Sequence, residues 1–137
     1  MPYSIHSCSS EHFNAIKSHI QKFELDNRCL EQHEFLVALQ HHMILGFGRI
    51  REHIDCSELC SLGVIEPERN KGVGTALTKA LIKKAEQQLY LVCIIPEFFE
   101  PLGFKVCENY PDSLKAKLNY CTNELVVPET YVVMKMA

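Results

Sequence analysis

The chain has 137 residues, of which 47% are hydrophobic and 23% charged, a composition typical of a soluble globular domain. Its net charge of -3 gives no electrostatic reason to expect nucleic-acid binding. No apolar stretch approaches the roughly 20 residues that a membrane span needs. The first ten residues lack the charged-then-apolar pattern of a secretion signal, so we expect a cytosolic protein.

Seven cysteines are scattered along the chain, without a C-x-x-C pair and without the Cys/His spacing of a zinc site. Several of them lie within apolar runs, as Cys93 does. We therefore expect buried, reduced thiols rather than disulfides or a metal centre.

The first predicted elements are a helix and a hairpin. Ser9 or Ser10 is a suitable N-terminal cap for the helix. Its apolar residues recur three or four positions apart, at Phe13, Ile16, Ile20 and Phe23. Two short apolar runs, residues 34–40 and 43–51, flank a pair of histidines at 41–42, which predicts an antiparallel hairpin.

In the second half, predicted strands alternate with helices. Residues 58–65 form an apolar strand that ends before Pro67, and a helical pattern continues from a glycine turn to about residue 88. Residues 89–95 are almost continuously apolar, as in a central strand covered on both faces. The remaining predicted elements are a short helix over 97–102 ended by Gly103, a strand over 104–108, a helix capped by Asp112 and continuing to 118, and a strand over 130–136.

This order predicts a mixed α/β domain. Antiparallel N-terminal strands precede a strand, helix and strand that should form a right-handed crossover, with strands 58–65 and 89–95 as a parallel central pair. Because the sequence has no internal repeat, low-complexity tract or linker, we expect residues 1–137 to form a single domain.

The turn before the second helix, residues 69–75, is the most informative segment. Glycine lets the backbone approach a ligand closely, and the first N–H groups of a helix point towards an anion. A Walker loop needs Gly-Lys before Ser or Thr, but here Lys71 precedes Gly72. A dinucleotide fingerprint needs a glycine at position 77, which is leucine. The alternative is a purely structural turn that begins the helix, in which the glycines allow tight packing and no ligand is bound.

The string Arg-x-x-Gly-x-Gly, from Arg69 to Gly74, resembles the pyrophosphate-binding signature of the GNAT superfamily of acyl-CoA N-acyltransferases. Residues 98–104, Phe-Phe-Glu-Pro-Leu-Gly-Phe, are similar to the aromatic-Glu-x-x-Gly-Phe segment of that family and stand in the same order. The resemblance is strong over residues 58–104 and rests on pattern alone elsewhere. The tail after residue 104 loosely resembles the amino-acid N-acetyltransferases of arginine biosynthesis.

The resemblance implies acetyl-CoA as co-substrate, no metal, and an amine acceptor that is a small molecule or a peptide. The pantetheine would lie where strands 58–65 and 89–95 diverge, and the Val64 amide would stabilise the oxyanion. The amides of residues 71–75 would hold the pyrophosphate. The residues implied to contact the cofactor are Leu62, Gly63, Val64, Arg69, Asn70, Lys71, Gly72, Val73, Gly74, Thr75 and Phe99.

Acyl transfer to an amine requires a group that removes the amine proton. Glu58 stands 11 residues before Arg69, the distance at which some GNAT enzymes carry a catalytic glutamate. Strand alternation would place Glu58 on one face with Cys60, Leu62 and Val64, where apolar neighbours would raise its pKa and make it a better base. A solvated glutamate at the strand edge is the alternative.

One departure from the family pattern weakens the catalytic interpretation. Many relatives have a tyrosine that protonates the leaving thiol, but the corresponding position is Phe99, and Tyr110 lies outside the motif. A catalytically impaired CoA-binding domain with a regulatory or assembly role is therefore an alternative, as is a relative in fold only that binds another phosphate ligand.

The acceptor side is less defined by the sequence. Arg49 or Arg51 would be the cationic partner of an acidic acceptor, and His53 could line the acceptor side. Cys60 as an acyl-carrying nucleophile is a further alternative. A monomer and a homodimer are equally compatible with the sequence.

Overall fold

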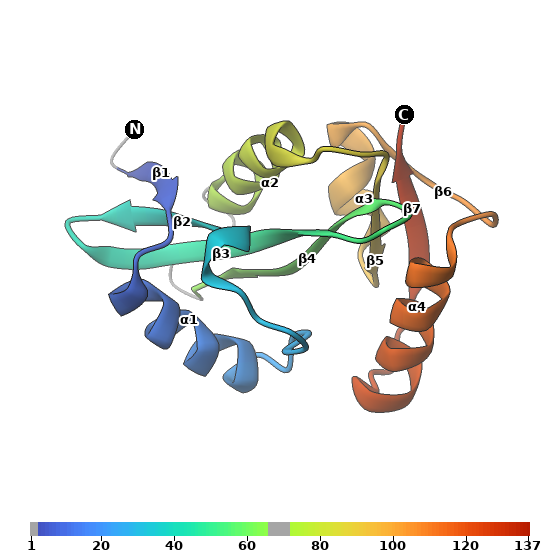
Figure 1. The fold of residues 1–137 in the computed structure, drawn as a ribbon, viewed down its shortest axis with the longest axis horizontal. Coiled ribbons are helices and arrows are strands. Elements are labelled where there is room, and N and C mark those ends of the chain that lie inside the picture. Colours follow the sequence, from blue (N-terminus) through green and yellow to red (C-terminus); the bar gives the residue numbers. More distant parts are fainter. Residues whose placement is uncertain (1–2, 66–71) are drawn as a thin grey trace. The chain divides into compact units, whose positions relative to one another are not determined.

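A computed structural model of the chain describes residues 3–65 and 72–137 (Figure 1). The elements in chain order are β1 (Ser4–Ser7), α1 (Ser10–Lys22), the short 3-10 helix η1 (Gln32–Glu34), β2 (Phe35–Gln40), β3 (Met43–Glu52), β4 (Ser57–Val64), α2 (Val73–Lys84), β5 (Leu89–Cys93), α3 (Pro96–Phe99), η3 (Glu100–Leu102), β6 (Phe104–Val106), α4 (Asp112–Glu124) and β7 (Val132–Met136). No helix within these described residues is both long enough and apolar enough to cross a membrane.

The strands form a seven-stranded mixed sheet in the order β1-β2-β3-β4-β5-β7-β6. β4 and β5 are parallel, whereas β1 with β2, β2 with β3, β5 with β7 and β6 with β7 are antiparallel. The predicted mixed α/β fold with a parallel central pair is therefore confirmed. The parallel register joins Ser57 to Leu89 and Glu58 to Tyr90, at the N-terminal ends of both strands. The predicted divergence further along these strands stays a prediction.

The first of two compact units combines Met1–Ile50 with Ser61–Lys84. Within it, α1 and α2 cover opposite faces of the β2–β3 hairpin (Figure 1). One face packs Ile16 and Ile20 of α1 against Phe35, Val37 and Phe47. The other packs Val73 and Leu77 of α2 against Ala38 and Leu45. The alternation of side chains along each strand thus gives the hairpin two buried faces.

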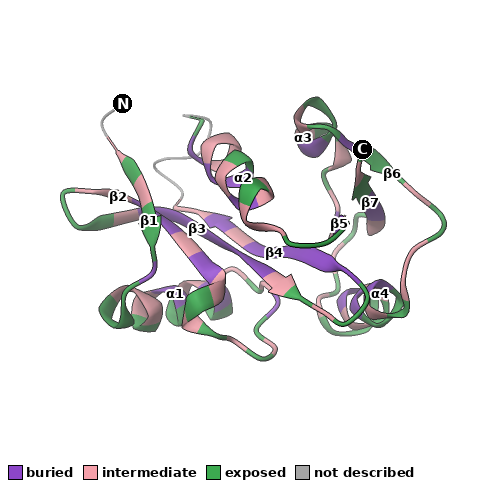
Figure 2. Ribbon diagram, turned by 45° about the horizontal axis from the view of Figure 1, so that its top comes forward, coloured by how far each residue is buried: buried purple, intermediate pink, exposed green. Residues whose placement is uncertain are grey.

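The second compact unit combines Arg51–Cys60 with Ala85–Ala137. Its core includes Leu114 of α4, which packs with Cys56, Tyr90 and Val133. The first half of β4 belongs to this unit and is buried along its length (Figure 2). That residues 1–137 form a single domain stays a prediction.

Several local predictions are confirmed. The Ser9 side chain accepts a hydrogen bond from the His12 N–H at 3.2 Å and so caps α1. His41 and His42 connect β2 to β3 with positive φ angles of 51° and 71°, as the tightest hairpin turns require. Gly103, with φ 104°, ends the helical segment before β6.

The structure adds one strand and corrects the bounds of two helices. β1 was not predicted. α4 continues to Glu124, and its N-cap is Pro111, so Asp112 is the first helical residue rather than the cap. α2 ends at Lys84 rather than near residue 88, because the next N–H groups leave the helical pattern: Glu86 donates to Glu52 Oε2 at 2.9 Å and Gln87 donates to Ser57 Oγ at 2.9 Å.

All seven cysteines lie within the described residues, and none of them forms a disulfide. Five are buried, Cys107 is half-buried and Cys29 is exposed. Burial raises the pKa of Cys56 to about 12 and that of Cys93 to about 11, so both are protonated thiols at neutral pH. The prediction of buried thiols therefore holds for most, but not all, of the cysteines.

Candidate functional site

The strand that carries most of the predicted site, β4, has an irregular backbone at its centre. Ser61 has a φ of 53°, in the left-handed region that non-glycine residues rarely adopt. Such a residue breaks the two-residue repeat of a strand. Glu58, Cys60, Leu62 and Val64 were expected to share one face of the strand. Because Ser61 interrupts the alternation, this expectation is wrong for Leu62 and Val64, which follow it.

Ser61 is fixed in this conformation by buried polar partners in the first unit. Its hydroxyl donates to the Asp26 carbonyl oxygen at 2.7 Å, and Arg49 Nε donates to the Ser61 oxygen at 3.0 Å. Backbone strain of this kind costs about 1–3 kcal/mol and persists only where its surroundings enforce it. It occurs at the residue that precedes Leu62, where the predicted cofactor-binding stretch begins.

Arg49 is a structural residue rather than the predicted partner of an acidic acceptor. Its side chain has no exposed surface, and its Nη1 lies 3.0 Å from Glu34 Oε1. The same guanidinium donates to the backbone carbonyl oxygens of Asp26, Arg28 and Cys29. The prediction for Arg49 is wrong because these partners occupy its hydrogen-bond donors. Arg51 is half-buried near the end of β3. Its role as the cationic partner of an acidic acceptor stays a proposal.

The end of β4 and the start of α2 come together in the first unit. Leu62 and Val64 pack against the cluster that contains Val73, the first residue of α2. A Cβ on Gly63 would lie 2.6 Å from Phe47 Cζ, so only glycine fits there. The predicted residues at these two ends are thus neighbours in space.

Gly72 begins the turn into α2 with a φ of 84°, and its carbonyl oxygen accepts the Ala76 N–H at 3.0 Å. Among the described residues, a Cβ placed on Gly72 would meet no atom within 4 Å, so the side-chain position of this glycine is open. Val73, Gly74 and Thr75 are the first three residues of α2. The first N–H groups of a helix have no hydrogen-bond partner within the helix. Arg69, Asn70 and Lys71, which the resemblance also implies, lie outside the described residues.

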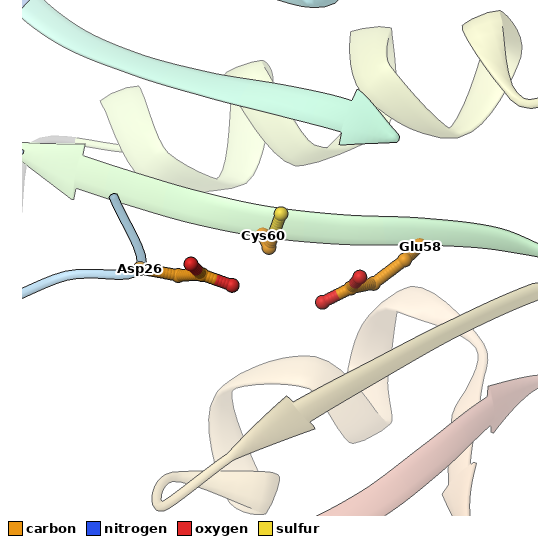
Figure 3. Close-up of side chains that lie close together, drawn as sticks. All are labelled: Asp26, Glu58 and Cys60. Atoms are coloured by element: carbon orange, nitrogen blue, oxygen red, sulfur yellow. The ribbon is translucent and has the colours of Figure 1, made fainter. Parts of the chain in front are cut away.

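Glu58 lies in the second unit at the centre of a buried ionic cluster. Its side chain has no exposed surface. Oε1 lies 2.7 Å from His53 Nε2, and Oε2 lies 2.9 Å from Lys117 Nζ on α4. We call Glu58, His53 and Lys117 the Glu58 cluster. Cys60 follows two residues later on the same strand, β4 (Figure 3). It is also buried.

The electrostatics of the Glu58 cluster correct a second expectation. Burial acts to raise the pKa of Glu58, but the hydrogen bond with His53 and the Lys117 ammonium outweigh it and lower the pKa to about 2. The predicted raised pKa is therefore wrong. Glu58 is an ionised carboxylate at neutral pH, which makes it a strong hydrogen-bond acceptor and a weak base.

We expect the lowered pKa of Glu58 to make the free energy of unfolding depend on pH in acid. A pKa lowered from 4.5 to about 2 gives roughly 3 kcal/mol of stability, present above about pH 4.5 and lost as the pH falls towards 2. Between pH 3 and 4.5, the free energy of unfolding should therefore depend less steeply on pH in Glu58→Gln than in the wild type, by about one proton.

Urea unfolding at several pH values in this range measures the difference. Glu97→Gln, which removes an exposed carboxylate on α3, is the matched control and should keep the wild-type slope. Equal slopes for the wild type and Glu58→Gln would contradict the lowered pKa.

Lys117 is the member of the Glu58 cluster that the sequence analysis missed. It lies on the buried stripe of α4 with Leu114 and Cys121, at spacings of three and four residues. A lysine on the apolar side of a helix needs a buried anion, because an unpaired charge is costly there. That spacing was the signal that could have identified it.

Phe99 packs as a core residue of the second unit. Its ring is 5% exposed and makes edge-on contacts with Phe98 and Phe104, with ring centroids 4.9 Å and 5.8 Å away. This apolar packing explains why an aromatic residue without a hydroxyl, phenylalanine, suits position 99. Its predicted contact with the cofactor stays a proposal.

The structure contains a parallel strand pair, β4 and β5, and a helix, α2, that begins directly after Gly72. This is the arrangement that the sequence resemblance implies for an acyl-CoA N-acyltransferase. A family model described as the acetyltransferase (GNAT) family matches residues 3–104. Because this match covers most of the chain, the chain belongs to the GNAT acetyltransferase family.

Solved structures support the fold. N-acetylglutamate synthase from Neisseria gonorrhoeae, complexed with coenzyme A and N-acetyl-glutamate, is 18% identical with a TM-score of 0.75 and covers 98% of this chain. Rv2747 from Mycobacterium tuberculosis, in complex with CoA and NLQ, is 18% identical with a TM-score of 0.78, over 98% of both chains.

Naa50 from Arabidopsis thaliana, in complex with the bisubstrate analogue CoA-Ac-MVNAL, is 14% identical with a TM-score of 0.69 and covers 100% of this chain and 99% of its own. This chain spans only about a third of the Neisseria synthase, 34% of its length. At these identities the similarity establishes the fold alone.

Proposed function

We propose that the protein is an acetyl-CoA-dependent N-acetyltransferase. It transfers an acetyl group to the primary amine of a small molecule or peptide, directly within a ternary complex. The observation that carries the proposal is the family match over residues 3–104, which includes the Glu58 cluster's strand and the start of α2. We further propose that it is cytosolic and acts as a monomer or homodimer.

The residues at the start of α2 suit a CoA pyrophosphate. The open side-chain position of Gly72 leaves room for an anion, and the helix dipole favours negative charge beside the amides of Val73, Gly74 and Thr75. The backbone of Leu62, Gly63 and Val64 would bond the pantetheine, and the Val64 amide would stabilise the developing oxyanion. Arg69, Asn70 and Lys71 complete the proposed set.

The chemistry forms a bond between the amine nitrogen and the thioester carbonyl carbon. The carbon–sulfur bond breaks, and the sulfur leaves as a thiolate that takes a proton from solvent. The amine gives up one proton, which is taken up at the Glu58 cluster. No group from the described residues is assigned to protonate the thiolate, since Phe99 has no proton to donate.

Amino acids and peptide N-termini are the first acceptors to test. The Neisseria synthase structure contains N-acetyl-glutamate, and the Naa50 structure contains a peptide-based bisubstrate analogue. Since Arg49 is buried, an acidic acceptor would need another cation, such as Arg51.

The test is an assay of CoA thiol release with acetyl-CoA and panels of amino acids, peptides and polyamines. We expect release that requires an amine, with one acetylated product per thiol found by mass spectrometry. Initial-rate plots should intersect, as for a ternary complex, and parallel lines would favour an acyl-enzyme, for example on Cys60. Absence of turnover with every amine would refute the proposed activity.

The alternative of a CoA-binding domain without catalysis is favoured by one observation, the phenylalanine at position 99. It predicts a thermal shift with acetyl-CoA but no thiol release in the same assay. A thermal shift with neither acetyl-CoA nor CoA would refute both functions and favour a different phosphate ligand.

A further inference from the structure

Each oxygen of the Glu58 carboxylate has a polar partner. Glu58 has no exposed side-chain surface, and Lys117, on Oε2, is 4% exposed. His53, on Oε1, is 18% exposed and is the most accessible member of the cluster. A proton that enters or leaves this cluster therefore has the imidazole as its most accessible route.

The contact with Glu58 determines which nitrogen of His53 carries a proton. A carboxylate accepts hydrogen bonds, so Nε2, 2.7 Å from Oε1, is the protonated nitrogen. The other ring nitrogen, Nδ1, is then the one that can accept a proton. The Lys117 ammonium keeps Glu58 ionised, and this maintains the hydrogen bond that fixes the tautomer.

The backbone of His53 is held at both of its polar groups. Its N–H donates to the Cys56 carbonyl oxygen at 2.8 Å, and its carbonyl oxygen accepts from Gln87 Nε2 at 2.7 Å. The imidazole therefore projects from a turn with a fixed backbone between β3 and β4. A proton-transfer group needs such a fixed position to reach a substrate reproducibly.

We propose that His53, rather than Glu58, takes the proton from the acceptor amine, and that Glu58 is a positioning residue for the imidazole. This inference rests on the proposed acyl transfer. As the nitrogen–carbon bond forms and the carbon–sulfur bond breaks, the amine proton moves to His53 Nδ1 and then to solvent. Among the described residues, the charged groups that interact with the ring are Glu58 on β4 and Glu52 on β3. Lys117 of α4 lies on the other carboxylate oxygen of Glu58, and Asp55 follows His53 by two residues in the same turn.

The experiment measures kcat/KM against pH for the wild type, His53→Gln and Glu58→Gln. The glutamine amide can still donate to Glu58 but cannot accept a proton at neutral pH, so His53→Gln tests the chemistry with little change in packing. We expect its kcat/KM to fall about 100-fold or more and the acid limb of the wild-type profile to disappear. The Kd for acetyl-CoA should stay within about twofold.

For Glu58→Gln we expect a smaller loss, about tenfold, with the acid limb retained but shifted, because the base remains while its orientation is lost. His42→Asn, an exposed histidine in the β2–β3 turn, is the control and should keep the wild-type profile, since asparagine tolerates its positive φ. Nitrogen-15 NMR of the imidazoles adds a readout without substrate, in which His53 should show a proton on Nε2.

The outcomes distinguish the role of His53 from the proposed acetyl transfer. A limb that disappears in Glu58→Gln but persists in His53→Gln would make Glu58 the base and overturn the inference alone. An NMR spectrum that placed the His53 ring proton on Nδ1 rather than on Nε2 would overturn it as well. A wild-type protein that acetylates no amine would overturn the proposed function, and the role of His53 with it.

Discussion

Arg49→Met is expected to lower the free energy of unfolding by about 3–5 kcal/mol, the largest stability loss that we expect from a single substitution. The variant leaves the Glu34 carboxylate without its cation and removes the donors to Ser61 and to three backbone carbonyl oxygens. Methionine fills a similar apolar volume, so the loss reflects the buried polar groups rather than a cavity.

Urea unfolding at pH 7, followed by circular dichroism, measures this loss. Arg51→Met is the matched control on the same strand, and because Arg51 is only half-buried we expect a change below about 1 kcal/mol. Adding Glu34→Gln to Arg49→Met should recover part of the loss, since it removes the unpaired carboxylate. Similar losses for the two arginine variants would contradict the structural role of Arg49.

Arg49 also illustrates what the sequence could not provide. Its position on a strand was predicted, but an arginine on a strand has the same sequence pattern whether it faces solvent or the interior. Its burial depends on Asp26, Arg28 and Glu34, which precede β2 in a segment without periodicity. The left-handed conformation of Ser61 had no signal either, because glycine is the residue that would have indicated it.

The elements that the sequence predicted well are those whose side chains carry the pattern. The apolar spacing of α1, the two runs of the hairpin and the continuous apolar stretch of β5 follow directly from burial. β1 was missed because it contains one apolar residue, Ile5, and joins the sheet through its backbone to β2. Backbone hydrogen bonds are available to almost any residue, so an edge strand can lack a side-chain pattern.

The same distinction applies to the Glu58 cluster. Counting from the glycine motif identified Glu58, and the structure gives this residue a buried position with two charged or polar partners. The pKa of Glu58 is lowered, whereas the sequence predicted that it is raised. That prediction rested on the apolar neighbours of Glu58 on β4, but the decisive cation, Lys117, is on α4. A pKa depends on groups that are close in space, and Lys117 is far from Glu58 in the sequence.

Gly74→Glu is expected to weaken acetyl-CoA binding about a thousandfold or more while leaving the protein folded. Gly74 is the second residue of α2, and we propose that its amide binds the pyrophosphate. A carboxylate here would repel the phosphates and displace them from two or three charge-assisted hydrogen bonds, each contributing about 1.5–3 kcal/mol. CoA should be affected as strongly as acetyl-CoA, because the pyrophosphate is common to both.

The stability of the fold should not fall in Gly74→Glu, in contrast to the affinity for acetyl-CoA. The first turn of α2 contains no acidic residue, and a glutamate near a helix N-terminus stabilises the helix by about 0.3–1 kcal/mol. Replacing a helical glycine adds a further gain in propensity. We therefore expect an equal or higher Tm without ligand, and loss of the Tm increase that acetyl-CoA gives the wild type. Reduced binding would then not result from unfolding.

Isothermal titration calorimetry with acetyl-CoA and CoA measures the affinity. Lys79→Gln is the matched control, because it makes the same change of one unit in net charge at an exposed position of α2. It should lose less than about threefold, since long-range electrostatics is screened at physiological ionic strength. If Gly74→Glu kept wild-type affinity, the pyrophosphate could not lie at the start of α2. If both variants weakened binding equally, the effect would be one of net charge, and the helix terminus would not be the binding site.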